Sequence, residues 1–358
     1  MKVFGSRIYF GSGDVNANTG AKDVWYLDPA TKKFSKEFTV DDETIQTYRD
    51  CFGDLCIPGA DATESWAFGN FYRKNSVGWQ KHRNLPSTSH VPDIYDYQGK
   101  LFAAVELYEP VNSPCQYAAG LAVSSDQGNT WSVQRLPEND AGTIFELNGQ
   151  LYMHADPIHQ WEILTVSPAG GNPSTCPRVH SSLYQYNTTS ATATPLPNVN
   201  LFPNAPAIIA TTPISSIITT LDINMVPNPV TFQGKLVYLG ATLSNHNAFG
   251  LWSASSLNQA QRIWFPGNPK VRDIKLDTDA SGVQTLYALT SNPQINGSSG
   301  TLEYRMAVFS TKDLNNWQEI LHFTAPTFAR SFAPYAGDFY FGMGGWGAAS
   351  ATSALMHL

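Results

Sequence analysis

One short pattern recurs along the chain and constrains its fold more than any other feature. Each copy is an apolar alternating strand, a tight turn with glycine, and a second strand that in most copies begins with an aliphatic–aromatic pair. The copies have their turns at Phe52-Gly53, Gln98-Gly99, Asn148-Gly149, Gln233-Gly234 and Ala336-Gly337, with a further copy at 4–9 and a looser one at 281–287. Because glycine adopts the positive φ that primed hairpin turns require, each copy predicts a β-hairpin with a face to bury.

A second pair of strands follows most of these hairpins, as in residues 24–38, 68–86 and 121–137. Two hairpins in succession make a four-stranded blade, and seven blades in 358 residues would take about 51 residues each. A lone blade cannot bury both of its faces, so neighbouring blades must stack. The sequence therefore predicts an all-β, seven-bladed β-propeller of four-stranded antiparallel blades, with six blades as the alternative, in a single domain over 1–358.

Two stretches interrupt the repeat. Residues 157–180 and 198–225 are rich in Pro, Thr, Ser, Asn and Gly, and we expect long loops within and after the fourth blade. After Phe339–Met343 only a short segment remains before Leu358. The last blade is therefore expected to lack its outer strand or to borrow one from the N-terminal segment.

Charge and hydropathy narrow the kinds of partner. The net charge is −7, from 29 acidic and 22 basic residues, and no Lys/Arg run occurs. Nucleic-acid binding needs a basic stripe, so no nucleic-acid partner is predicted. No stretch approaches the roughly 18 apolar residues of a membrane helix, so no membrane insertion is predicted. Strand-like sequence begins near Met1 without a signal peptide. We expect a mature or trimmed form, or a protein that leaves the cell by another route, such as a virion component.

The four cysteines give a weak signal. Cys51 and Cys56 flank one hairpin turn, but the repeat places them diagonally rather than directly opposite, which is poor geometry for a disulfide. A bridge between Cys115 and Cys176 is a weaker possibility still. No C-x₂-C spacing occurs, so no metal site is predicted from them. No cofactor is predicted either, and a structural cation such as calcium is left open.

Residues 124–131 read Ser-Ser-Asp-Gln-Gly-Asn-Thr-Trp and fit the pattern S-x-D-x-G-x-T-W in full. We interpret them as a turn in which Ser124 and Asp126 bond the backbone, Gly128 is left-handed and Trp131 packs between blades. Residues 310–317 are a degenerate copy without glycine. On these residues the chain resembles the Asp-box (BNR-repeat) propellers, the superfamily that includes sialidases. The resemblance implies a structural turn on the face away from any active site.

Candidate ligand-binding residues come from the geometry of a propeller. The start of a blade's first strand and the end of its second strand share one face, where side chains converge on the central channel. The positions read off the repeats are Arg49, His90, Arg272 and Arg330 at the starts of first strands, and Asp14, Asp61, Glu106, His154, Asp156 and His246 near the ends of second strands.

Three arginines from different blades can clamp a carboxylate, because guanidinium groups pair with it through two hydrogen bonds. The resemblance implies the same use, since sialidases carry an arginine triad with a Tyr–Glu nucleophile pair and an Asp acid. The family's Arg-Ile-Pro segment is missing here, and Arg7-Ile8-Tyr9 is its closest echo. No Tyr–Glu pair is assigned, and Tyr335 is a candidate by position alone. The alternative is that these polar residues simply line a hydrated channel.

Two further groups invite a functional interpretation. His154 and Asp156 lie two apart in a predicted strand and so share a face, where they can bond each other, share a cation, or act as base and acid in polysaccharide elimination. Trp66 and Trp346, which have Gly and Ala nearby, can stack on sugars or pack between blades.

These observations support three hypotheses. The first is a non-catalytic propeller that binds a glycan or a surface partner, outside the cell or on a virion, with the cytoplasm left open. The second is a sialidase-like glycoside hydrolase or a polysaccharide lyase. The third is a structural propeller of a larger assembly such as a phage tail. The predicted ligand-binding residues are Arg49, Arg272, Arg330, His90, Trp66 and Trp346, and the catalytic candidates are His154, Asp156, Asp61, Glu106 and Tyr335.

Overall fold

The computed structural model describes residues 1–13, 19–108, 117–138, 140–156, 182–196, 199, 201–203, 221–223, 229–242, 248–297, 300–344 and 354–358. Regular structure in these residues consists of β-strands alone. No helix in the described part of the chain is long and apolar enough to cross a membrane. Contacts divide the chain into two compact units. We call Phe4–Val199 the N-terminal unit, and Asn200–Leu358 together with Met1–Val3 the C-terminal unit.

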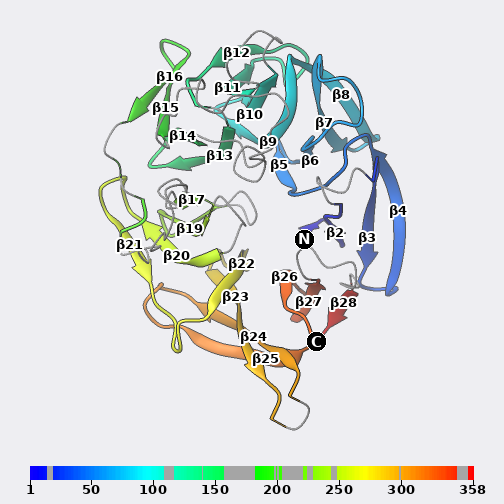
Figure 1. Cartoon of the computed structure of the whole chain (residues 1–358), viewed down its shortest axis with the longest axis vertical. Helices are drawn as coiled ribbons and strands as arrows, with labels where there is room; N and C mark the ends of the chain where they lie inside the picture. The colour runs from blue at the N-terminus through cyan, green and yellow to red at the C-terminus, as the bar shows by residue number, and fades with distance from the viewer. Residues whose placement is uncertain are drawn as a thin grey trace, which may run out of the picture. The chain divides into compact units, whose positions relative to one another are not determined.

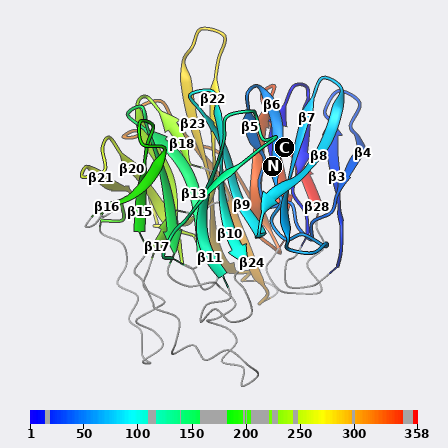
Figure 2. The same cartoon turned by 90° about the horizontal axis from the view of Figure 1, so that it is seen from above.

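The first four blades each contain four strands that follow one another across the sheet (Figure 1). Figure 2 shows neighbouring strands such as β9 and β10 running alongside each other. Their bounds are β1 (Lys2–Phe4), β2 (Arg7–Phe10), β3 (Lys22–Asp28) and β4 (Lys33–Val40) in blade 1; β5 (Arg49–Cys51), β6 (Asp54–Pro58), β7 (Phe68–Asn75) and β8 (Gly78–Pro86) in blade 2; β9 (Thr88–Tyr97), β10 (Lys100–Tyr108), β11 (Tyr117–Ser124) and β12 (Ser132–Arg135) in blade 3; and β13 (Asp140–Leu147), β14 (Gln150–Asp156), β15 (Ser182–Asn187) and β16 (Thr192–Leu196) in blade 4.

The other three blades belong to the C-terminal unit. In blade 5, β17 and β18 both pair with β19 at different heights, so they share the position of the innermost strand. The bounds are β17 (Leu221–Ile223), β18 (Val230–Phe232), β19 (Lys235–Thr242), β20 (Ala248–Ala254) and β21 (Ala260–Ile263) in blade 5; β22 (Lys270–Thr278), β23 (Gln284–Ile295), β24 (Leu302–Thr311) and β25 (Gln318–Ala325) in blade 6; and β26 (Ala329–Tyr335), β27 (Asp338–Met343) and β28 (Ala354–His357) in blade 7.

The predicted fold class is confirmed: the chain is an all-β propeller with seven antiparallel blades, and the six-blade alternative is wrong. Blade 7 has three strands in the described residues, in agreement with the expected loss of an outer strand. Within the insertion predicted over about 198–225, residues 221–223 form β17 of blade 5. The insertion predicted over 157–180 lies outside the described residues.

The hairpin turns have the backbone conformation that their glycines predicted. In the Gln98-Gly99 turn both central residues have positive φ, 49° and 75°, and in Asn148-Gly149 the values are 52° and 72°. Two successive positive φ angles define the type I′ turn, whose twist matches that of the strands it joins. In the blades that have this turn, the repeated glycine therefore sets the register of the first hairpin.

Within each unit, the hydrophobic core lies between consecutive blades. Along β10, Leu101, Ala103 and Val105 pack with residues of blade 2, whereas Phe102 and Ala104 pack with residues of blade 4. Successive side chains of a strand point to opposite faces, so both faces of an interior blade are covered. This two-sided burial explains why the second strands are continuous apolar runs rather than alternating ones.

The turn over residues 124–131, between β11 and β12, has the hydrogen bonds that its sequence predicted. The Ser124 hydroxyl donates to Asp126 (2.7 Å) and accepts from the Gly128 amide (2.7 Å), while the Thr130 amide and hydroxyl donate to Asp126 (2.8 and 2.7 Å). Gly128 is left-handed, with φ of 94°. Trp131 packs edge-on against Phe71 of blade 2, so the motif joins neighbouring blades.

Cys51 and Cys56 are buried free thiols. Cys56 pairs with Arg49 across the hairpin and Cys51 pairs with Asp54, so the two cysteines are diagonal neighbours. The diagonal placement expected from the repeat is confirmed, and the two cysteines are not joined by a disulfide. Cys115 and Cys176 lie outside the described residues.

Candidate functional site

A group of titratable side chains in the N-terminal unit surrounds His90, near the start of β9. Its Nδ1 lies 3.3 Å from Glu106 Oε2, and its Nε2 lies 3.5 Å from Asp61 Oδ1. The side chains of His90 and Asp61 are 15% and 17% exposed, and that of Glu106 is 6% exposed. A protonated imidazole can therefore face a carboxylate at each nitrogen while solvent still reaches the group.

The chain brings these three residues together through the ends of two strands and one loop. His90 and Glu106 are direct cross-strand partners in β9 and β10. Asp61 belongs to the loop between β6 and β7, which meets the start of β9 where the Val91 amide donates to the Gly59 carbonyl (2.8 Å). The predicted convergence of first-strand starts and second-strand ends is therefore seen at this site.

Aromatic rings border the same group. The Trp66 ring lies 6.3 Å from the His90 ring and nearly perpendicular to it, at 89°. It also lies 5.2 Å from Tyr108 and 6.2 Å from Tyr117, measured between ring centres. We call Asp61, Trp66, His90, Glu106, Tyr108 and Tyr117 the His90 cluster. Titratable groups beside a partly open aromatic wall can recognise both the hydroxyls and the C–H faces of a sugar.

A buried carboxylate supports the loop that carries Asp61 and Trp66. Asp42 is fully buried; its Oδ1 accepts from the Asp61 amide (3.2 Å), and its Oδ2 accepts from Tyr72 (2.5 Å) and Asn70 (3.1 Å). Burial raises the pKa of Asp42, and these donors oppose that rise. Gly59 is required nearby, because a Cβ there would lie 2.4 Å from the Asn70 carbonyl oxygen.

Arg49 does not have the predicted ligand-binding role. Its Nε and Nη2 donate to the two carboxylate oxygens of Asp93 in blade 3 (2.7 and 2.5 Å), and Nη2 also donates to the Ile144 carbonyl in blade 4 (3.0 Å). Burial alone would lower the pKa of Arg49, but the Asp93 charge and hydrogen bonds outweigh it and raise the pKa. The guanidinium is buried between three blades, so this residue is structural.

Arg272 and Arg330 lie in the C-terminal unit, on the first strands of blades 6 and 7. Arg272 is half-buried and Arg330 is exposed. Nε of Arg272 donates to Ser291 Oγ (2.7 Å), and the guanidinium carbon is 3.9 Å from the centre of the Phe328 ring. The structure thus separates the three arginines of the sequence hypothesis into one structural residue and one pair on adjacent blades.

The other candidates are placed as follows. Tyr335 pairs with Asp338 beside the hairpin turn, at the opposite end of β26 from Arg330. His154 is buried in β14 and Asp156 ends that strand opposite Asp140. Predicted candidates that lie outside the described residues are Asp14, His246 and Trp346.

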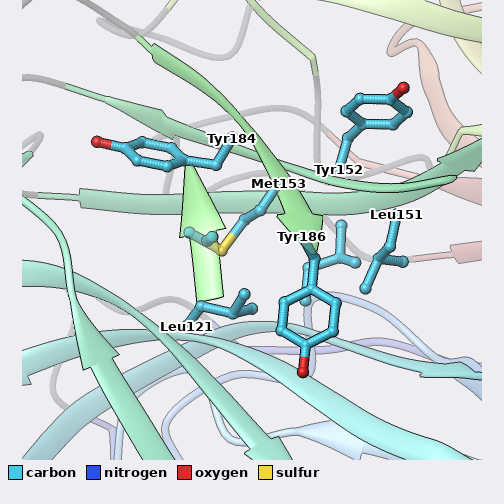
Figure 3. Close-up of a pocket in the computed structure, with 8 residues that line it drawn as sticks. Leu121, Leu151, Tyr152, Met153, Tyr184 and Tyr186 are labelled. Atoms are coloured by element: carbon cyan, nitrogen blue, oxygen red, sulfur yellow. The ribbon is translucent and has the colours of Figure 1, made fainter. Parts of the chain in front are cut away.

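Figure 3 shows a hollow in the N-terminal unit that is part of the core rather than a binding site. It is lined by Leu121, Met153, Tyr184 and Tyr186 among other residues, and it has no room for a water molecule. Tyr184 is fixed there by a hydrogen bond to the buried Glu138 carboxylate (2.7 Å). In the part of the chain that the structure describes, no group of three or more His, Cys, Asp or Glu residues is arranged to hold a metal ion.

Sequence reasoning missed two members of the His90 cluster. Tyr108 lies two residues beyond Glu106 on β10, and Tyr117 is its direct partner at the start of β11. A signal for Tyr108 was present, because it shares the strand end already singled out for Glu106. Tyr117 gave none, since eight residues separate it from Tyr108 and no local pattern in them fixes which residues pair.

Comparison with known proteins gives distant likenesses. No family model and no curated protein matches the chain. The β-propeller domain of the Trilobed protease from Pyrococcus furiosus is 10% identical, covers 88% of this chain and 78% of its own, and has a TM-score of 0.45. An ulvan lyase, described as a polysaccharide lyase, is 11% identical with coverage of 94% and 87% and a TM-score of 0.45. The GH43_1 enzyme from Xanthomonas citri is 11% identical with coverage of 76% and 88% and a TM-score of 0.40. Likenesses this distant carry no statement about activity.

Proposed function

We propose that the chain is a carbohydrate-binding propeller and that the His90 cluster is its saccharide site. The observation that carries the proposal is the meeting of an imidazole, two carboxylates and three aromatic rings within one small, partly open region of the N-terminal unit. Carboxylates accept hydrogen bonds from sugar hydroxyls, and aromatic rings pack against the apolar face of a pyranose. As expected from the sequence, the partner would be a glycan outside the cell or on a virion.

The test is binding of the full chain to a glycan array, with affinities then measured for the saccharides that bind. We expect Trp66→Ala and His90→Ala to weaken binding at least tenfold, or about 1.4 kcal/mol. Trp25→Ala is the matched control, because Trp25 is an exposed tryptophan of the same unit outside the cluster. Absence of any glycan binding, or equal losses in Trp66→Ala and Trp25→Ala, would refute the proposal.

A second candidate function is acid–base catalysis on the bound saccharide. What favours it is the placement of His90, with one carboxylate oxygen within 3.5 Å of each ring nitrogen. An imidazole that donates to one of these carboxylates and keeps its other nitrogen unprotonated can remove a proton from a substrate and return it, while that carboxylate fixes its orientation. A hydrolase would release reducing ends, and a lyase would release an unsaturated product that absorbs in the ultraviolet.

Catalysis is tested with a panel of polysaccharides and the variants His90→Gln and Glu106→Gln. We expect turnover to fall at least a hundredfold in His90→Gln while saccharide binding is partly retained. If the wild-type chain binds saccharides and changes none of them, binding stands and catalysis is excluded.

A further inference from the structure

A cavity of about 280 Å³ lies against blade 6 in the C-terminal unit. Three neighbouring strands of the blade, β23, β24 and β25, line it together with the connection that leads in from blade 5 (Figure 1). Among its lining residues, Thr290 on β23 is 2% exposed, whereas the side chains of Arg305 on β24 and Glu319 on β25 are 37% and 31% exposed. The cavity therefore reaches solvent on the side of Arg305 and Glu319.

The strand register places the polar lining residues on one face of the blade. Asn292 and Arg305 are direct cross-strand partners, and Thr290 lies two residues before Asn292 on the same face. Further along that face, Ala288 and Ala307 pack with apolar residues of blade 5. The cavity thus lies where the apolar interface between blades 5 and 6 gives way to polar side chains.

The connection between blades 5 and 6 forms a rigid wall. The Asn268 amide donates to the Phe265 carbonyl (3.0 Å), and Gly267 has φ of 75°. With Pro266 at its second position, this is a type II turn. Pro266 and Pro269 line the cavity, and the ring of a proline fixes its φ angle. A wall that is already ordered loses little conformational entropy when a ligand binds.

Two aromatic residues form the apolar part of the lining, Phe309 and Trp317. Both rings pack against Phe265, with ring centres 5.3 Å and 4.7 Å apart. The Trp317 Nε1 donates to the Leu314 carbonyl (3.0 Å), which fixes the indole in place. Rings held in this way offer an apolar surface to the C–H groups of a ligand.

The polar lining has unused hydrogen-bonding capacity and no unpaired charge. Nη2 of Arg305 donates to Glu319 Oε1 (2.6 Å), and Nδ1 of His322 lies 2.8 Å from the same oxygen. Within the described residues, no partner is found for the other N–H groups of Arg305, for Glu319 Oε2 or for the Asn292 amide. Because the guanidinium and the carboxylate neutralise each other, the cavity offers donors and acceptors to a neutral ligand.

We propose that this cavity is a second saccharide site, which takes one neutral pyranose ring. A sugar hydroxyl both donates and accepts hydrogen bonds, so it can pair with the donors of Arg305, the carboxylate of Glu319 and the amide of Asn292. Small-molecule sites are cavities of about 300 Å³ or more, and a cavity near this lower bound admits a ligand of one ring. The site is separate from the His90 cluster and does not depend on the function proposed for that cluster.

The test is titration calorimetry of the full chain and of its Trp66→Ala variant with the methyl glycosides of glucose, galactose, mannose and xylose. We expect at least one of these neutral sugars to bind, and to bind both proteins alike. Asn292→Ala should weaken this binding about three- to tenfold through the lost hydrogen bond, and Asn292→Phe should abolish it by filling the cavity. Glucuronate and glucosamine, which carry opposite charges, should bind no more tightly than the neutral sugars.

Gln294→Ala is the matched control. Gln294 is exposed and lies two residues beyond Asn292 on the same face of β23, outside the cavity lining, so its loss should leave the affinity unchanged. Circular dichroism of each variant checks that a loss of binding is not unfolding. Asn292→Ala keeps the test valid if Asn292→Phe fails to fold, because alanine introduces no larger side chain.

The proposal is overturned if none of the neutral sugars binds, if a charged sugar binds more tightly than all of them, or if Gln294→Ala loses as much affinity as Asn292→Ala. The same titrations separate it from the function proposed for the His90 cluster. If Trp66→Ala abolishes binding of every methyl glycoside, the blade 6 site is refuted while the His90 proposal stands. If glycan binding is lost in Asn292→Phe and unchanged in Trp66→Ala, the blade 6 site stands and the His90 proposal is refuted.

Discussion

Asp93 in the N-terminal unit and Asp273 in the C-terminal unit stand at the same position of the repeat. They make the same hydrogen bond to the next blade but face different positive charges. Each is buried on the first strand of its blade and accepts the amide of the next blade's first strand: Ile144 donates to Asp93 (2.8 Å), and Phe332 donates to Asp273 (3.0 Å). We call these two bonds the inter-blade latches. The repeat therefore fixes an acceptor between blades as well as the fold of each blade.

The counter-charges of the two latches differ. Asp93 is held by two hydrogen bonds from the buried Arg49 of the preceding blade. Asp273 is held by Lys275 of its own strand (3.0 Å), whose side chain is 25% exposed. A buried guanidinium cannot replace its partner with water, whereas a partly exposed ammonium can. The same backbone hydrogen bond therefore accompanies a buried ion pair in the N-terminal unit and a partly exposed ion pair in the C-terminal unit.

Removing the buried carboxylate of the first latch should have the largest effect. Asp93→Ala leaves the Arg49 charge and the Ile144 amide without their acceptor, and we expect a loss of about 3–5 kcal/mol in the free energy of unfolding. The measurement is the urea unfolding midpoint of the full chain, followed by tryptophan fluorescence and circular dichroism. A loss below 1 kcal/mol would show that the latch is not structural.

The equivalent change in the second latch should cost less. Asp273→Ala leaves the Phe332 amide unsatisfied, but Lys275 can turn toward solvent, so we expect a loss of about 1–3 kcal/mol. The same urea titration measures it beside Asp93→Ala. If the two alanine variants lose equal amounts of unfolding free energy, the counter-charge does not change how much each latch contributes to stability.

How far the sequence predicted this molecule can be judged from these same elements. Glycines such as Gly99 and Gly149 fix the hairpin turns locally, so the blades could be predicted from the sequence. The expectation that the starts of first strands and the ends of second strands share one face correctly brought Asp61, His90 and Glu106 together. The role of Arg49 could not be read, because its partner lies 44 residues away in another blade. Pairing across blades depends on how neighbouring blades pack against each other, and no local sequence pattern records that.

Asparagine at the two latch positions separates the acceptor from the charge. Asn keeps an oxygen that can accept the next blade's amide but removes the negative charge. Asp93→Asn should therefore remain costly, at about 2–3 kcal/mol, because Arg49 stays buried and unpaired, while Asp273→Asn should cost about 1 kcal/mol or less. The ratio of the two losses, measured from urea midpoints in one buffer, tests the comparison directly. A ratio near one contradicts it.

The turn acids make a second equivalent pair and carry the smallest predicted effect, one that depends on pH. Hydrogen bonds from Ser124 and then Thr130 lower the pKa of Asp126 to about 2, and the amide and side chain of Asn316 lower the pKa of Asp313 to about 2. Because both folded values lie below the ordinary value of about 3.9, the stabilisation is complete above pH 4 and is lost as pH falls from 4 toward 2.

Asp126→Asn and Asp313→Asn should therefore lower the urea midpoint slightly at pH 6, and their difference from the wild-type chain should shrink at the lowest pH at which the chain remains folded. The two variants should behave alike, although one turn has the left-handed Gly128 and the other has Leu314 with φ of 66°. In both turns the carboxylate accepts hydrogen bonds from the turn backbone. We therefore expect it to stabilise the turn that has Leu314 in place of a glycine as well. A variant whose difference from the wild-type chain does not change with pH would show that its carboxylate is not the group that titrates.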